Sequence, residues 1–176
     1  MDSVRQRETH HRSAFRLLLA QVLVLFTASA CISLNLTPQK GERSKGVQFT
    51  PPSAPYISLS TTHADLAWQN KQNGNSISYF STCNDPADPS LEIISNELFA
   101  DMRDLNVIRR DTRLFNAREA LDIEVEGKVE GVPTKVRALI FKKNGCIYTL
   151  TLVGLPPVFE EDRGRFDGFL RSFQAP

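Results

Sequence analysis

The sequence predicts an α+β domain with a mostly antiparallel sheet covered by helices on both faces. Apolar and polar residues alternate through much of the stretch 121–153, which is typical of strands. The dipeptides Asn73-Gly74 and Asn144-Gly145 suit tight hairpin turns between neighbouring strands. Apolar residues recur at helical spacing both before and after these strands, which predicts the two helical layers.

Residues 1–30 are expected to be a secretory signal peptide. Arginines outnumber acidic residues in the first sixteen positions, and an uncharged apolar run follows over residues 17–30. That run is shorter than the ~20 residues that a membrane-spanning helix needs. Export with cleavage is therefore favoured over a spanning helix.

The end of this leader, Ala28-Ser29-Ala30-Cys31, resembles the lipobox of bacterial lipoproteins, with Ala28 where leucine is usual. The resemblance implies that the thiol of Cys31 is acylated and that Cys31 becomes the new N-terminus. Each buried acyl CH₂ group would contribute ~0.8 kcal/mol to membrane binding. Ile32 after the cysteine, in place of aspartate, favours the outer membrane. Cleavage without acylation, which would leave Cys31 as a free or paired thiol, is the alternative.

Residues 31–55 are expected to form the lipidated N-terminus and a flexible tether, because they are rich in charged residues, glycine and proline. Residues 56–176 are then long enough for one globular domain. The net charge of the whole sequence is +1, without the basic stripe that nucleic-acid binding needs. We therefore expect a membrane-tethered, exported domain that does not bind nucleic acid.

The first elements of the domain are two strands, over residues 64–69 and 75–83, joined across Asn73-Gly74. Asp88 can cap a following helix and Pro89 suits its first turn. Leu91, Ile94, Leu98, Met102 and Leu105 then recur at helical spacing. This pattern predicts an amphipathic helix that runs to about Asp104.

The later strands form two hairpins. A turn at Gly131-Val132-Pro133 with Glu130 opposite Pro133 would set Glu126 against Arg137 on a solvent-exposed face, where Asp122 and Glu124 also lie. Lys135 and Arg137 can balance these acids. The Asn144-Gly145 turn would set Phe141 opposite Tyr148 and Leu139 opposite Leu150.

A closing helix is expected after Pro156-Pro157. Its apolar residues are Phe159, Phe166, Phe169, Leu170 and Phe173. The acidic run over residues 160–162 falls in its first turn, where negative charge stabilises the helix dipole.

This order of elements, with the ending F-x-x-F-L-x-S-F over residues 166–173, resembles the Mog1/PsbP-like α/β/α sandwich. The resemblance covers roughly residues 56–173. It implies a fold that serves mainly in binding and assembly, and it transfers no functional residue, because no motif position matches.

Cys83 ends one predicted strand and Cys146 begins another. In an oxidising compartment, two such cysteines suggest a structural disulfide. Two buried free thiols and a redox pair are the alternatives, and the C-x-x-C spacing typical of a redox pair is missing.

No catalytic, cofactor or metal site is expected. His63 is the one histidine beyond the signal peptide, and no G-x-S-x-G, G-x-G-x-x-G or P-loop motif occurs. Metal binding also lacks a histidine pair or closely spaced cysteines.

Two functional classes remain open. The first is a non-catalytic interaction or assembly module with a protein partner in the cell envelope, for which Trp68 and Tyr56 are candidates for an exposed aromatic patch. The second is a periplasmic binding protein for a small apolar or lipid ligand, with a cavity lined by Phe141, Tyr148 and Phe166. Ordinary core packing is the alternative for each of these aromatic residues.

Overall fold

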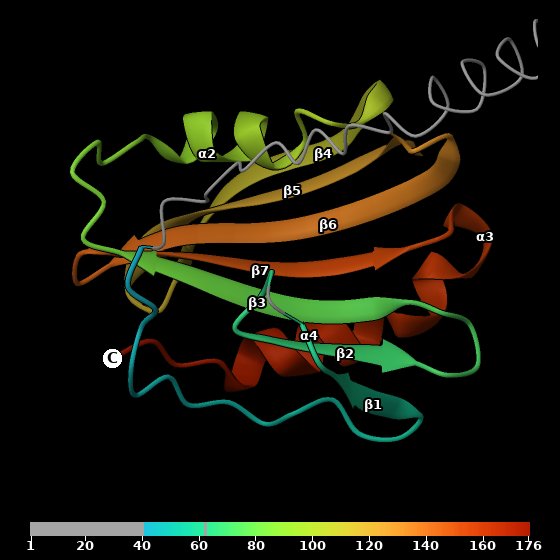
Figure 1. The fold of residues 1–176 in the computed structure, drawn as a ribbon, viewed down its shortest axis with the longest axis horizontal. Coiled ribbons are helices and arrows are strands. Elements are labelled where there is room, and N and C mark those ends of the chain that lie inside the picture. Colours follow the sequence, from blue (N-terminus) through green and yellow to red (C-terminus); the bar gives the residue numbers. More distant parts are fainter. Residues whose placement is uncertain (1–40, 62) are drawn as a thin grey trace, which may run out of the picture. The chain divides into compact units, whose positions relative to one another are not determined.

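Seven antiparallel strands form one sheet in the order β1-β2-β3-β7-β6-β5-β4 (Figure 1). The computed structural model describes residues 41–61 and 63–176. The strands are β1 Tyr56–Leu59, β2 Leu66–Asn70, β3 Ser76–Cys83, β4 Arg103–Phe115, β5 Arg118–Val129, β6 Val132–Lys143 and β7 Cys146–Gly154. The helices are α2 Leu91–Leu98, α3 Pro156–Phe159 and α4 Arg163–Ser172, with a 3₁₀ turn η1 at Glu160–Asp162. The predicted α+β class with an antiparallel sheet is confirmed.

The hairpin of β6 and β7 has the predicted register. Asn144 and Gly145 both adopt left-handed backbone angles, φ 51° and 74°, as a two-residue hairpin turn requires. Phe141 therefore lies opposite Tyr148, and Leu139 lies opposite Leu150.

The register predicted for β5 and β6 is wrong. Glu130 and Gly131 adopt left-handed angles, φ 51° and 85°, so the turn lies one residue earlier than expected. Val129 then pairs with Val132, which places Glu126 opposite Lys135 instead of Arg137.

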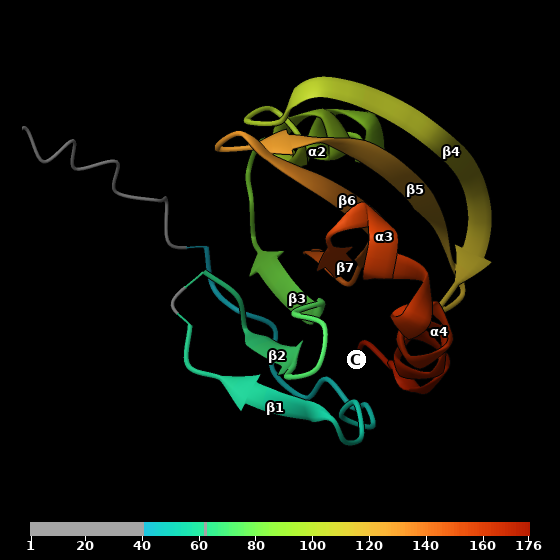
Figure 2. The ribbon, with the colours of Figure 1, turned by 90° about the vertical axis from the view of Figure 1, so that its right-hand side faces the viewer.

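Two apolar clusters lie on alternate residues of the central strands. Val136, Ala138 and Ile140 of β6 pack with α2, while Leu139 and Phe141 pack with the phenylalanines of α4. Successive strand residues point to opposite faces of a sheet, so each cluster belongs to one face. Figure 2 shows the sheet curving around α3 and α4.

The helix α2 is shorter than predicted. Ser90 is its N-cap, and its hydroxyl accepts a hydrogen bond of 3.3 Å from the backbone N–H of Ile93. Asp88 has φ 41° and lies outside the helix, so the predicted cap is wrong. The helix ends at Leu98, and Leu105, predicted to be helical, lies in β4.

The strand β4 has no counterpart in the sequence-based prediction. It is an edge strand of 13 residues, mostly exposed, and both of its faces carry charged side chains. Without a buried face it lacks the alternation by which strands are usually recognised.

The flexible tether predicted for residues 31–55 is wrong for residues 41–55. The Phe49 ring lies 5.4 Å from the Tyr79 ring and 5.7 Å from the Phe169 ring, centroid to centroid. Gln48 donates its backbone N–H to the carbonyl of Gln174 at 3.0 Å. These contacts hold residues 41–55 against the domain. A single aromatic side chain buries a large apolar surface, so Phe49 can pack on the core although the residues around it are polar. Residues 31–40, with Cys31, and the signal peptide predicted over residues 1–30 lie outside the described residues.

Cys83 and Cys146 form a disulfide bond. They lie directly opposite each other where β3 ends and β7 begins, so the bond joins two neighbouring strands across 63 residues of sequence.

Candidate binding groove

A groove of about 610 Å³ opens on the α2 face of the sheet. Its floor comes from β2, β3, β6 and β7 with the last residue of β5, and residues at and after the end of α2 form one wall. The lining is predominantly apolar. The apolar lining residues include Ala67, Phe80, Leu98, Phe99, Met102, Val129, Val136 and Val153.

Short side chains on the strands create this space. Ser76 and Ser78 of β3 and Thr151 of β7 face the groove, where larger residues would fill it. The helix α2 has only eight residues and packs on β5 and β6. The predicted helical cover is therefore incomplete on this face.

Three of the hydroxyl groups on the floor already have partners within the protein. Ser78 and Thr151 share a hydrogen bond of 2.8 Å between their hydroxyl oxygens, and the Thr134 hydroxyl donates to the Val132 carbonyl at 2.9 Å. The ionisable lining residues are His63 and Asp101, both exposed. The floor therefore suits an apolar ligand that needs few hydrogen bonds.

The aromatic residues predicted to make contacts lie elsewhere. Trp68 and Tyr56 are only 6% and 7% exposed, so they form no surface patch. Phe141, Tyr148 and Phe166 are fully buried in the cluster on the α4 face. The ligand cavity predicted around them is wrong, because their side chains fill the core.

The acids of β5 lie on a covered face instead of the predicted exposed one. Asp122 is 1% exposed and contacts three guanidinium groups: Arg137 at 2.9 Å, Arg109 at 3.0 Å and Arg113 at 3.1 Å. Burial acts to raise the pKa of Asp122, but the hydrogen bonds from Arg137 and the nearby positive charges outweigh it and lower the pKa.

Glu124 is held in a similar way. Arg163 lies at 2.8 Å and Lys135 at 3.1 Å from its carboxylate oxygens. Burial opposes ionisation of Glu124, and hydrogen bonds from these two partners lower its pKa overall. The predicted balance of these acids by Lys135 and Arg137 is confirmed, with partners shifted by the corrected register.

A third covered carboxylate, Asp162, joins the hairpin of β2 and β3 to the C-terminal helices. It is fully buried and accepts hydrogen bonds of 2.8–3.1 Å from the side-chain amides of Asn70, Asn73 and Asn75. Burial acts to raise its pKa, and the amide donors with the charge of Arg165 lower it overall. Sequence reasoning assigned Asp162 only to the helix dipole, because its partners lie about 90 residues away in the chain.

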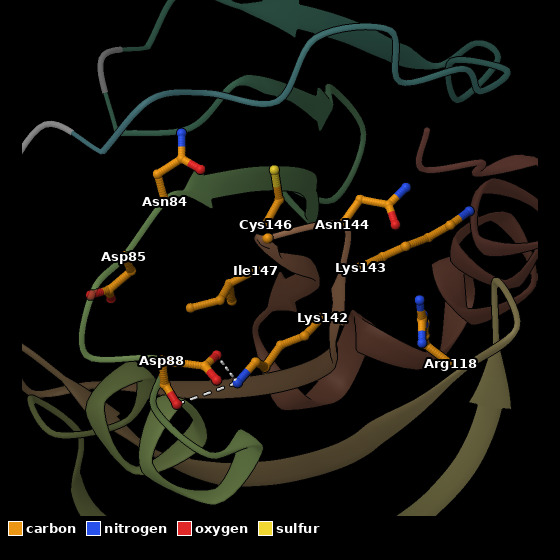
Figure 3. Close-up of a pocket in the computed structure, with 10 residues that line it drawn as sticks. Asn84, Asp85, Asp88, Arg118, Lys142, Lys143, Asn144, Cys146 and Ile147 are labelled. Carbon is orange, nitrogen blue, oxygen red and sulfur yellow. Dashed lines mark hydrogen bonds and ion pairs between the residues drawn. The ribbon is translucent and has the colours of Figure 1, made fainter.

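A polar pocket of about 360 Å³ lies beside the Asn144-Gly145 turn (Figure 3). Lys142 pairs with Asp88, Lys143 donates to the Ala175 carbonyl at 2.7 Å, and Asn144 donates to the Pro176 carbonyl at 2.8 Å. Lys142, Lys143 and Asn144 are thus engaged in contacts within the protein. Arg118, which also lines the pocket, makes no ion pair or side-chain hydrogen bond among the described residues, so its guanidinium is the charged donor that the pocket offers.

Among residues 41–61 and 63–176, no group of three or more His, Cys, Asp or Glu side chains is placed to hold a metal ion. Within the same residues, no helix is long and apolar enough to cross a membrane.

Comparison with known proteins identifies the fold. No protein-family model matches the chain, and no curated protein sequence matches it. Among solved structures, cyanobacterial PsbP (CyanoP) from Synechocystis sp. PCC 6803 is similar, with a TM-score of 0.56, 14% identity, and coverage of 77% of this chain and 92% of that one. The domain has a PsbP-like fold.

A second solved structure with this PsbP-like fold is LpqN of Mycobacterium tuberculosis, described as involved in cell envelope biogenesis. It matches with a TM-score of 0.57 and 9% identity, over 80% of this chain and 88% of LpqN. At these identities the likeness shows the fold alone.

Proposed function

We propose that this protein is a lipid-anchored, non-catalytic module of the bacterial cell envelope that binds an alkyl chain in the α2 groove. The groove carries the proposal, because its lining is mostly apolar and three of the hydroxyl groups on its floor already have partners. Such a surface gains free energy from burying an apolar chain without leaving polar groups unsatisfied.

An envelope location fits this proposal. The leader over residues 1–30 and Cys31 would bring the domain to a membrane, where alkyl chains are abundant. Ile32 favours the outer membrane by resemblance to lipoproteins. LpqN, which shares the fold, is described as involved in cell envelope biogenesis.

Charge placed at the groove should weaken alkyl-chain binding. We expect dansyl-undecanoate to bind the full chain saturably, and Val129→Glu to weaken binding at least about tenfold, since a charged group would then have to be desolvated at the lining. Ile93→Glu is the control, because Ile93 is 49% exposed on α2 and does not line the groove. Titration of probe fluorescence checks this. Equal affinities in both variants would contradict the proposed site.

The anchor has its own test. Cys31→Ala should move the protein from the membrane fraction to the soluble fraction and remove the acyl adduct from its mass spectrum, because the acylated thiol is lost. Ser33→Ala retains the cysteine and should remain in the membrane fraction. If Cys31→Ala stays at the membrane to the same extent, the protein is not anchored by lipid on this residue.

An interaction or assembly module is the second candidate function. The observation that favours it is the outer edge of β4, with which no other strand pairs in the part of the chain that the structure describes.

A further inference from the structure

The strand β4 lies at the edge of the sheet and is regular over its second half. Arg109 to Phe115 pair with β5 residue by residue, and the register shifts of β4 lie before this stretch. Among the described residues, no strand or isolated bridge pairs with the other side of β4. Unpaired backbone N–H and C=O groups of this kind can accept another strand.

The turn determines which backbone groups point outward. Asn116 and Ala117 both have left-handed angles, φ 50° and 60°, so Phe115 and Arg118 close a two-residue hairpin. In such a hairpin the closing pair exchanges hydrogen bonds, and the next pair does not. The N–H and C=O groups of Arg110, Thr112 and Leu114 therefore face away from β5.

A pocket of about 370 Å³ lies beside this edge, between the end of β4 and α4. Arg113 and Arg171 line it with one acid, Asp167, whose carboxylate accepts a 2.7 Å hydrogen bond from Arg137. Arg113 contacts Asp122 through Nε at 3.1 Å, and within the described part of the chain Arg171 makes no ion pair. The pocket therefore has an excess of positive charge.

We propose that β4 binds an extended acidic segment of a partner protein by strand addition, with one carboxylate of that segment between Arg113 and Arg171. Backbone hydrogen bonds along Arg110, Thr112 and Leu114 would supply affinity, and the pocket would supply specificity. Guanidinium groups bind carboxylates strongly because they donate two parallel hydrogen bonds.

The charge of the edge argues for an acidic partner over a second copy of this chain. Two β4 strands side by side would bring together two sets of arginines at positions 109, 110 and 113, with one acid among them in each strand, Asp111. Charged residues on an edge strand also deter aggregation. The proposal specifies the partner of the second candidate function and does not depend on ligand binding in the groove.

Binding of a model strand tests this proposal. The probe is a fluorescein-labelled peptide of alternating Thr and Val with one central Glu, added to the full chain and followed by fluorescence anisotropy. We expect saturable binding that weakens about tenfold when the Glu is replaced by Gln in the peptide, or when the protein carries Arg171→Gln. Lys71→Gln, an equal charge change in an exposed loop, should have no effect.

Proline at Thr112 tests the backbone part. Thr112→Pro removes an outward N–H without breaking a bond to β5, and should abolish peptide binding, whereas Thr112→Val should retain it. The proposal is overturned if the peptide does not bind, if its Gln form binds equally well, or if the wild-type chain forms a dimer that Thr112→Pro dissociates. If Thr112→Pro does not fold, Arg171→Gln decides the question. If Val129→Glu loses alkyl-chain binding and still binds the peptide normally, the groove and the β4 edge are independent binding sites.

Discussion

Replacement of Asp162 by alanine is expected to lower the free energy of unfolding by about 4 kcal/mol. The carboxylate is fully buried. Three asparagine side chains donate hydrogen bonds to it from the end of β2 and from the loop that leads to β3. Its removal would leave the buried side-chain amide of Asn70 without an acceptor and that of Asn75 with the Val158 carbonyl alone, and it would weaken the connection of β2 and β3 to η1. Chemical denaturation followed by circular dichroism measures the effect.

The adjacent acid offers a matched control. Glu161 is exposed and makes one 2.9 Å hydrogen bond with Asn73, so Glu161→Ala should change stability by less than about 1 kcal/mol. Equal effects of the two substitutions would show that the hydrogen bonds of Asp162 do not stabilise the contact between the hairpin of β2 and β3 and η1.

The same carboxylate should make stability fall in acid. The pKa of Asp162 is lowered in the folded state, so its contribution is present above the pKa of the unfolded chain, about 4, and is lost as pH falls through the folded value. Asp122 and Glu124 have lowered pKa values and act in the same direction. Asp162→Asn should therefore show a shallower loss of stability below pH ~4 than the wild-type chain.

Loss of the disulfide is the second large expected effect. A double Cys83→Ser, Cys146→Ser variant should have a free energy of unfolding about 4 kcal/mol lower than that of the wild-type chain. The disulfide restricts the unfolded chain, because it links residues 63 positions apart. Denaturation midpoints with and without a thiol reductant measure this difference.

The reductant also provides the control. It should destabilise the wild-type chain to the level of the double variant and leave the double variant unchanged. A wild-type chain whose stability does not respond to full reduction would contradict a stabilising bond between β3 and β7.

Local chemistry explains which elements could be predicted. The Asn144-Gly145 turn sets the register of β6 and β7 by itself, since both residues readily adopt left-handed angles. The turn between β5 and β6 lies at Glu130-Gly131, one residue before the predicted position, which shifts the register of these strands. The sequence did not reveal this turn, because glutamate seldom adopts left-handed backbone angles. The phenylalanines of α4 were predictable from helical spacing alone.

Features that depend on tertiary structure were not predictable. Phe49 is a single aromatic residue in a polar segment, and only the assembled core offers it partners. The groove exists because α2 stops at Leu98 while the sheet continues beneath it. One signal was present in the sequence: Ser76 and Ser78 occupy alternate positions in β3, and Thr149 and Thr151 do so in β7, as expected for a strip of small side chains on one face.

Photo-crosslinking in membranes tests the central claim most directly. The full chain would be expressed in cells supplied with a fatty acid that carries a diazirine on its alkyl chain, irradiated, and digested for mass spectrometry. Binding in the groove predicts crosslinks concentrated at lining residues such as Phe80, Met102 and Val129, with loss of these crosslinks in Val129→Glu. Crosslinks spread evenly over the surface, or absent from the groove, would contradict the proposed function.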